Sequence, residues 1–252
     1  MSSRVSSSVS WGIALIVLGA ASASAQPGIP DPAKSSVPDF IKIGGMTTST
    51  GDPDPSVTFT ITFRDFASNP VPNARIVLDF AACTDTRICS ATVGAGCEGG
   101  SATVTGLTDA NGQATFSILG AAMNWGGDPC PTPPRLCPGA AEHCITVYTI
   151  VNGDPQPILL GHATAVVYDE DGALSGGAGG VNAGDLAKLK ADVAAYGLLG
   201  APAYRGRSDL TTDHAINSAD VARMKSLIAL AGLGLGSGAG CVSGGTAAPF
   251  CP

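Results

Sequence analysis

Residues 57–64 read V-T-F-T-I-T-F-R, and this stretch decides the class of fold. Its apolar residues fall at every second position, and Thr or Arg fills the positions between them. Successive side chains of a β-strand point to opposite faces of a sheet, so the pattern predicts a strand with one buried and one exposed face. We therefore expect a protein built mainly of β-structure.

The same alternation returns after the turn N-P-V-P-N at 69–73. Residues 75–80 (RIVLDF) predict a second strand, whose inward side chains are Ile76, Leu78 and Phe80.

A further turn is expected at 109–112 (DANG), because Asn and Gly tolerate the left-handed backbone of a tight hairpin. The strand after this hairpin points Ala114, Phe116 and Ile118 inward. Later strands are expected at 144–151 and 160–168, and no helical period appears before about residue 183. Several short strands separated by turns predict a β-sandwich over residues 38–168.

The composition excludes some classes of protein. The chain has 252 residues, a net charge of −7 and a sequence pI near 4.7. A nucleic-acid-binding surface needs clustered Lys and Arg to displace counterions from the phosphates, and the 13 basic residues of this chain are scattered. We therefore expect no nucleic-acid partner.

Residues 1–25 have the features of an export signal. Arg4 supplies a positive charge, residues 11–18 (WGIALIVL) form a short apolar core, and Ala23-Ser24-Ala25 predicts cleavage before Gln26. The apolar run is shorter than the roughly 20 residues that span a bilayer. We expect a secreted, extracellular protein without a membrane span in the mature chain; an uncleaved anchor is the alternative. Residues 26–37, rich in Pro and Ser, predict a linker.

The number of cysteines, eight, agrees with an oxidising compartment. If the last two pair with each other and every cysteine is bonded, at least one disulfide must join the first cluster to the second. The remaining connectivity stays open, and a metal cluster is the alternative, although no C-x-x-C spacing supports it. The three clusters are Cys83, Cys89 and Cys97; Cys130, Cys137 and Cys144; and Cys241 with Cys251.

An internal repeat begins near residue 181. V-N-A-G-D-L-A-K-L-K at 181–190 matches I-N-S-A-D-V-A-R-M-K at 216–225, 35 residues later. Each copy runs from Asn-x-x-Asp into an amphipathic helix, and Gly197 and Gly232 are expected to end the two helices. Neither helix can bury its apolar face alone, so the two are expected to pack together. These faces contain Leu186, Leu189 and Val193, and Val221, Met224 and Ile228.

Oxygen-bearing residues recur through residues 209–220, which read D-L-T-T-D-H-A-I-N-S-A-D. A hard cation such as Ca²⁺ takes about six to eight oxygen ligands, and a loop that curls around it offers them at alternate residues. An N-capped helix without an ion is the alternative, because Asp and Asn are common helix caps. The expected calcium ligands are the side chains of Asp209, Thr211, Asp213, Asn217 and Asp220, with the main-chain carbonyl of Ala215.

Residues 58–80 (TFTITFRDFASNPVPNARIVLDF) and 106–118 (GLTDANGQATFSI) resemble bacterial Ig-like domains of the invasin and intimin type. The resemblance covers about residues 38–168 and departs from the family in two cysteine-bearing insertions, around 83–100 and 122–144. It implies an Ig-like β-sandwich that serves as a stalk or a binding module without catalysis.

The loop at 209–220, which ends in Asp, precedes a helix and belongs to a repeat, resembles the dockerin family. In that family the motif D-x-N-x-D-G-x-x-N-x-x-D-φ occurs twice, where φ is an apolar residue. The resemblance covers about residues 169–232 and implies calcium-dependent docking to a cohesin-type partner domain. It also implies that Ser218-Ala219 and Ala183-Gly184 help to choose the partner, and neither pair is strongly polar. We expect a dockerin-like module at 169–235 and a Gly-rich tail at 236–252.

His214 departs from the dockerin pattern, because the family usually has Gly there. Gly adopts a positive φ without strain, whereas another residue costs on the order of 1–3 kcal/mol. This departure predicts weakened calcium affinity at the loop.

The first copy of the repeat lacks the acids of the second. The 35-residue offset places Leu174 and Ala178 where the second copy has Asp209 and Asp213. Asp169 and Asp171 can supply oxygens only if residues 174–180 (LSGGAGG) bulge out as an insertion. The alternative is that the first copy is a metal-free packing partner.

No catalytic motif stands out, so we expect a protein that is not an enzyme. The match of residues 94–99 to G-x-G-x-x-G is not followed by a helical pattern, and the chain contains 34 Gly.

The sequence thus predicts a secreted, non-catalytic protein, an Ig-like β-sandwich followed by a small α-helical dockerin or EF-hand-like module. Docking through that module would serve polysaccharide breakdown or surface attachment. The alternative is an extracellular structural or adhesion protein whose helical repeat packs only internally.

Overall fold

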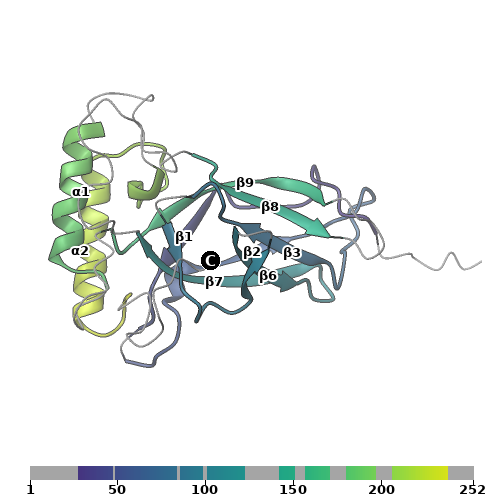
Figure 1. The fold of residues 1–252 in the computed structure, drawn as a ribbon, viewed down its shortest axis with the longest axis horizontal. Coiled ribbons are helices and arrows are strands. Elements are labelled where there is room, and N and C mark those ends of the chain that lie inside the picture. The colour runs from purple at the N-terminus through teal and green to yellow at the C-terminus, as the bar shows by residue number, and fades with distance from the viewer. Residues whose placement is uncertain are drawn as a thin grey trace, which may run out of the picture.

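The computed structural model describes residues 28–47, 49–83, 86–98, 101–122, 142–150, 157–170, 180–196 and 206–237. Every strand in these ranges precedes residue 168, and both α-helices follow residue 182 (Figure 1). The expectation of a mainly β protein with helices toward the C-terminus is therefore confirmed. The predicted export signal lies outside the described residues.

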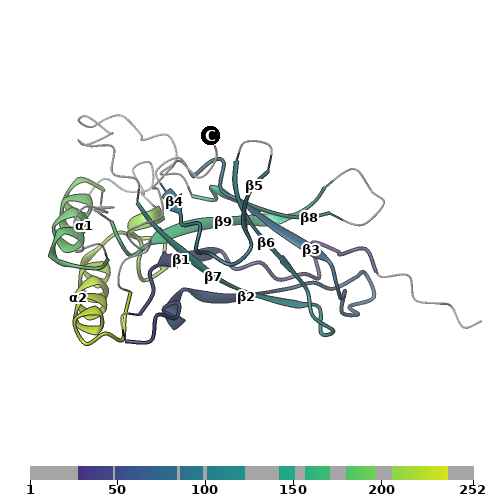
Figure 2. The same cartoon turned by 60° about the horizontal axis from the view of Figure 1, so that its bottom comes forward.

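The strands form one curled, mixed sheet (Figures 1 and 2). Their order is β2-β7-β1-β9-β8-β3-β6-β5, and β4 pairs with β7 beyond the end of the β2 contact. Neighbouring strands run antiparallel except where β1 is involved. The strands are β1 (Phe40–Gly44), β2 (Thr58–Thr62), β3 (Arg75–Asp79), β4 (Thr86–Ile88), β5 (Ala95–Glu98), β6 (Ser101–Leu107), β7 (Gln113–Ala122), β8 (Ile145–Ile150) and β9 (Ile158–Val167).

Strand β1 makes the sheet continuous. It runs parallel to β9, from the pair Phe40↔Thr164 to the pair Ile43↔Val167, and parallel to β7 at Ile43↔Ile118. These contacts join one antiparallel group (β2, β7 and β4) to another (β9, β8, β3, β6 and β5). The sheet therefore curls around one core, whereas the sequence-based expectation was a sandwich.

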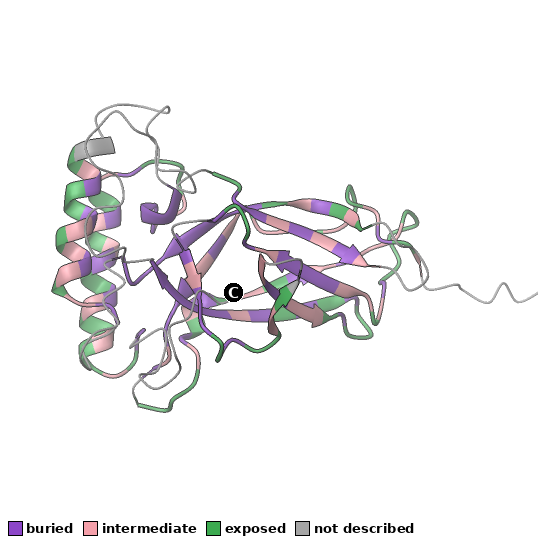
Figure 3. Cartoon of the chain, viewed as in Figure 1, coloured by how far each residue is buried: buried purple, intermediate pink, exposed green. Residues whose placement is uncertain are grey.

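The main core lies within the curl of the sheet (Figure 3). Most of the side chains that the alternation pointed inward are buried: Ile76, Leu78, Phe80, Ala114, Phe116 and Ile118 are each at most 5% exposed. Phe59 is only partly buried, and Val77 is fully buried although the alternation pointed it outward. The alternation predicts burial where a strand turns one face to the core and the other to solvent, and it fails at β3, where both faces are covered.

The turn at 109–112 forms as expected, but the strands on either side of it do not pair. The Asp109 N–H donates to the Gln113 carbonyl at 2.8 Å, and Gly112 has a φ of 69°. Beyond the turn, β7 pairs with β2 while β6 pairs with β3 and β5. The Phe116 ring lies between the parting strands, and a Cβ at Gly106 would come within 2.8 Å of it. The predicted hairpin is therefore wrong in its pairing.

A disulfide joins Cys83, after β3, to Cys144, before β8. The expected bridge between the first and second cysteine clusters is therefore confirmed. Because the bridge spans 61 residues, it stabilises the fold by about 4 kcal/mol, mainly by restricting the unfolded chain. Cys89 and Cys97 are disulfide-bonded as well.

Two α-helices lie side by side at one end of the sheet (Figures 1 and 2). They are α1 (Ala183–Tyr196) and α2 (Ser218–Gly232), and short 3₁₀ turns occur at η1 (Pro55–Val57) and η3 (Gly206–Ser208). The predicted packing of helix against helix is confirmed, and α2 ends at Gly232 as expected. None of the described helices is long and apolar enough to cross a membrane.

The helices share a second apolar core with the sheet. Val57, Val166 and Tyr168 supply the sheet side of this core, and the helical side includes Leu189 and Met224, both fully buried. The first copy of the repeat thus packs against both the second copy and the end of β9, which is continuous with the main sheet.

Close packing at Gly120 predicts a large loss of stability in Gly120→Ala. The added Cβ would overlap the Arg87 carbonyl oxygen of β4 and lie 2.7 Å from Cγ2 of Ile43 in β1. We expect a loss of about 1–3 kcal/mol, measured by denaturant unfolding. The control is Gly232→Ala, where nothing lies within 4 Å of the new Cβ, and we expect a gain of about 0.5 kcal/mol. Equal stabilities would contradict the observed contact of β4 with β7.

The turn before β7 predicts a pH-dependent contribution from Asp109. The backbone N–H of Gln113 and, to a smaller degree, that of Asn111 hold the pKa of this carboxyl below its ordinary value. A pKa that is lowered by folding adds stability above the unfolded pKa, and this stability is lost as pH falls through the folded pKa. The melting temperature of Asp109→Ala should therefore lie below that of the parent at neutral pH, with a gap that narrows below about pH 4. Asp52→Ala, which removes an exposed acid from another loop, is the control.

Candidate metal centre

The loop 209–220 connects η3 to α2. All three residues of η3 are buried, and Asp209 follows them directly. The backbone then turns sharply at Thr212 and at His214, each with a φ of 62°. The positive φ at His214 is the conformation that a Gly would supply at this position of a curled cation loop. The loop is thus folded back on itself before α2 begins at Ser218.

Three carboxylates converge within this loop. One oxygen atom from each of Asp209, Asp213 and Asp220 lies within 4.8 Å of the other two. Asp209 and Asp220 are fully buried, whereas Asp213 is exposed at the mouth of the cluster. Like charges this close repel one another, so the arrangement favours a cation among them.

The loop backbone wraps around Asp209. Its Oδ1 accepts hydrogen bonds from the N–H groups of Thr212 at 2.7 Å and Asp213 at 3.2 Å. Its Oδ2 accepts a hydrogen bond from the N–H of His214 at 2.8 Å. These donors hold the first acid of the loop in a fixed direction while it is buried.

Asp220 both caps the helix and belongs to the cluster. Its Oδ2 accepts the Asn217 N–H at 2.8 Å, which is half of a capping box with the Asn217 side chain. Its Oδ1 accepts both the N–H and the hydroxyl of Thr211, each at 2.9 Å. The carboxylate of Asp220 therefore lies in the first turn of α2, where the helix dipole stabilises a negative charge.

Of the other expected ligands, Thr211 lies among the carboxylates, whereas the side-chain oxygen of Asn217 is used to cap α2. The Thr211 hydroxyl lies between the carboxylates, 2.9 Å from Asp220 and 3.4 Å from Asp209. The side-chain oxygen of Asn217 instead accepts the Ala219 N–H at 2.7 Å, so its role in this structure is that of an N-cap. Ala215 donates its N–H to Asp213 at 3.0 Å. Coordination by Thr211, by Asn217 and by the Ala215 carbonyl stays a prediction.

One cationic side chain of the sheet lies within electrostatic range of Asp209. Burial lowers the pKa of Lys42, on β1, and the charge of Arg223, on α2, lowers it further. The charge of Asp209 acts in the opposite direction. The positive charge of Lys42 therefore offsets part of the negative charge of the loop from the side of the sheet.

Contacts between the loop and the sheet were not predicted from the sequence. The His214 ring lies with its centroid 4.8 Å from that of Phe40, and its Nδ1 lies 3.2 Å from Oε1 of Glu142. Phe40 precedes His214 by more than 170 residues, and no local pattern links them. The departure of His214 from Gly was visible in the sequence and was the one available sign of an additional role.

The first copy of the repeat forms the same helix start as the second. The Asn182 N–H donates to Asp185 at 2.7 Å, and the Gly184 N–H donates to the side-chain oxygen of Asn182 at 2.7 Å. The corresponding bonds of Asn217 and Asp220 have nearly the same lengths. Residues 171–179, which include the predicted contribution of Asp171 and the bulge, lie outside the described residues.

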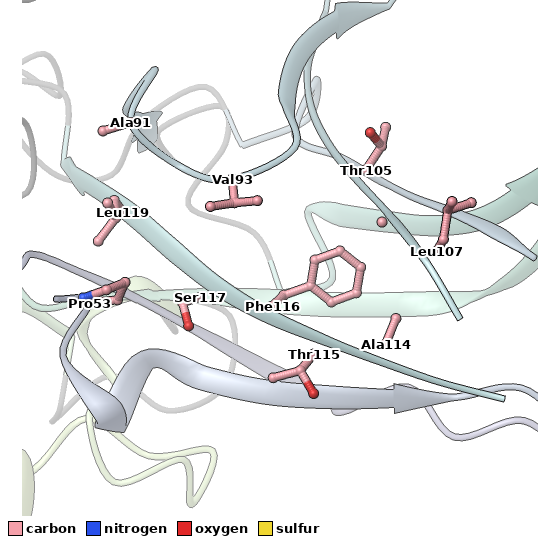
Figure 4. A pocket seen from close by; sticks show the side chains of 11 residues that line it. Pro53, Ala91, Val93, Thr105, Leu107, Ala114, Thr115, Phe116, Ser117 and Leu119 are labelled. Atoms are coloured by element: carbon pink, nitrogen blue, oxygen red, sulfur yellow. The ribbon is translucent and has the colours of Figure 1, made fainter. Parts of the chain in front are cut away.

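A pocket of about 300 Å³ opens where β6 and β7 part (Figure 4). Phe116 and Leu119 of β7 line one side, and Val93 and Leu107 line another. Its polar lining consists of Thr and Ser hydroxyls and main-chain atoms, without an acid, a base or a thiol. This lining offers no group for proton transfer, so the loop is the stronger functional candidate.

Comparisons with known proteins found no match that bears on the site. No protein-family model, no curated protein and no solved structure matches the chain. The interpretation therefore depends on the oxygen donors of the loop and on the backbone that positions them.

The geometry of the loop predicts that Asp213→Ala loses calcium-dependent stability and little else. Asp213 is exposed and accepts one hydrogen bond, from Ala215, so its removal should hardly change the melting temperature in EDTA. In calcium the parent should gain about 2.7 kcal/mol at 100 times Kd, and the variant should gain much less. Thermal unfolding with and without calcium measures both, with Asp52→Ala as the control.

Asp220→Ala is a poorer probe, because Asp220 also caps α2. Its removal should lower the stability of the chain with or without calcium. Equal gains from calcium in the parent and in Asp213→Ala would contradict a cation site at the cluster.

Proposed function

We propose that residues 209–220 bind Ca²⁺ and that the chain is a secreted, non-catalytic protein with a calcium-dependent, dockerin-like docking module. Its proposed partner is a cohesin-type protein domain. The observation that carries the proposal is the convergence of Asp209, Asp213 and Asp220 within 4.8 Å, at the start of a helix that belongs to a repeat. The N-capped helix without an ion needs only Asn217 and Asp220, whereas a cation site also uses the carboxylates of Asp209 and Asp213.

Calcium suits this set of donors. Carboxylates, a Thr hydroxyl and a main-chain carbonyl are hard oxygen ligands, and a flexible loop can supply the six to eight that Ca²⁺ takes, whereas thiol and imidazole donors would favour transition metals. Mg²⁺ demands a smaller, regular octahedron and retains water. The disulfide between Cys83 and Cys144 agrees with an oxidising compartment, where calcium is abundant.

The proposed docking surface is the start of the two helices. Ala183, Ser218 and Ala219 are exposed there, and Gly184 is partly exposed. These are the positions at which the dockerin resemblance implies a choice of partner. A calcium ion in the loop would fix the first turn of α2 and with it the direction of Ser218 and Ala219.

The Ig-like assignment of the sheet belongs to the same proposal. If β1, β2, β3, β7, β8 and β9 are strands A, B, C, E, F and G, the observed pairs β2–β7, β3–β8 and β8–β9 correspond to B–E, C–F and F–G of an Ig-like sandwich. The parallel pairs of β1 with β7 and with β9 link the two groups. In this interpretation the sheet is a spacer that carries the helical module.

A structural or adhesive role is the second candidate, and one observation favours it. The helices bury Leu189, Met224 and Leu227 in a core that Val166 and Tyr168 of the sheet region complete. In this case calcium would only stabilise an arrangement that is internal to the chain.

Binding to cohesin domains separates the two candidates. Surface plasmon resonance of the mature chain on a panel of cohesin domains should give binding in calcium that EDTA abolishes. Ala219→Glu should weaken docking at least about tenfold, because it adds bulk to the proposed surface, while an acid in the first helical turn leaves the helix stable. Thr60→Glu, on the exposed face of β2, is the matched control and should bind as the parent does.

Calcium-dependent stability without binding to any cohesin would favour the structural role. Docking that persists in EDTA would contradict the proposed mechanism.

A further inference from the structure

His214 lies in the loop 209–220, where its backbone has a positive φ and its N–H donates to a candidate metal ligand. Its φ of 62° lies in the left-handed region, which residues other than Gly adopt at a cost, although His adopts it more readily than most. Its N–H donates to Oδ2 of Asp209 at 2.8 Å, so the same residue helps to orient a candidate metal ligand. Strain of this kind persists where surrounding contacts compensate for it.

The compensating contacts come from the sheet. The His214 ring is tilted by 58° against the Phe40 ring at a centroid distance of 4.8 Å, a favourable geometry for two aromatic rings. Its Nδ1 lies 3.2 Å from Oε1 of Glu142, with both side chains about half exposed. The loop therefore touches the sheet through a side chain that a Gly would lack.

Both partners of His214 are firmly tied to the sheet. Phe40 is the first residue of β1 and pairs with Thr164 of β9. Glu142 precedes Cys144, which the disulfide joins to Cys83 at the end of β3. These attachments place the partners of His214 independently of the loop.

We infer that His214 is a latch that couples cation binding in the loop to the attachment of α2 to the sheet. The left-handed turn that lets the loop wrap around Asp209 is the same turn that directs the imidazole toward Phe40 and Glu142. A cation that fixes the turn strengthens the contact with the sheet. By thermodynamic reciprocity, the contact with the sheet then strengthens cation binding by the same factor.

The latch rests on the proposed calcium site and adds a regulatory consequence to it. Calcium concentration sets how firmly the start of α2 is held against the sheet and therefore how uniformly the proposed docking surface is presented. A Gly at position 214 would relieve the strain but would sever this coupling, which gives a reason for His at this position.

A double-mutant cycle on the mature full chain tests the latch, with isothermal titration of Ca²⁺ as the measurement. Phe40→Ala should weaken calcium binding roughly fivefold in the parent and should have no effect on calcium affinity in the His214→Gly background. Glu142→Gln, an exposed change that leaves the core intact, should cause a smaller loss that also vanishes in His214→Gly. Phe66→Ala removes an 85% exposed Phe elsewhere on the chain and should leave calcium affinity unchanged.

The outcomes distinguish the latch from the site itself. If the parent binds no calcium, the proposed function and the latch both fail. If the parent binds calcium and neither Phe40→Ala nor Glu142→Gln weakens it, the latch is overturned while the metal site stands. Should Phe40→Ala fail to fold, Glu142→Ala, which removes the oxygen that contacts the imidazole, decides the matter in the parent and in His214→Gly.

Discussion

The convergence of three carboxylates at the start of α2 is the feature on which the proposed function of this protein depends. Asp209 and Asp220 are fully buried, and Asp213 closes the cluster from the solvent side. Hydrogen bonds from the loop backbone and from Thr211 stabilise each acid separately, and Lys42 offsets part of the summed charge. A divalent cation is the direct way to balance the rest, because it attracts all three acids at once.

Strand β1 links the loop 209–220 to the rest of the sheet. It joins the two antiparallel groups of the sheet, and its side chains reach the loop through Phe40 and Lys42. The second core, shared by the helices and the end of β9, holds the helix pair beside β1. The loop therefore lies where the sheet and α2 meet.

The parts of the fold that obey a local rule could be predicted from the sequence. Alternation located β2, β3, β7, β8 and β9. The parity of the cysteine clusters, with every cysteine bonded, required a bridge such as Cys83–Cys144. The ligand spacing correctly grouped all three of the expected acids. Short strands such as β4 carry too few residues for a pattern. The parting of β6 from β7 around Phe116 and the contact of His214 with Phe40 depend on tertiary packing, which no local pattern encodes. The dockerin and Ig-like assignments stay predictions.

The most direct test of the cation site is a crystal structure of the mature chain grown in millimolar calcium, with an anomalous difference map. A calcium ion in the loop should give a peak about 2.3–2.6 Å from carboxylate oxygens of Asp209, Asp213 and Asp220 and from the Ala215 carbonyl. A map without a peak, in which the three carboxylates keep only their hydrogen bonds to the loop, would contradict the proposed site.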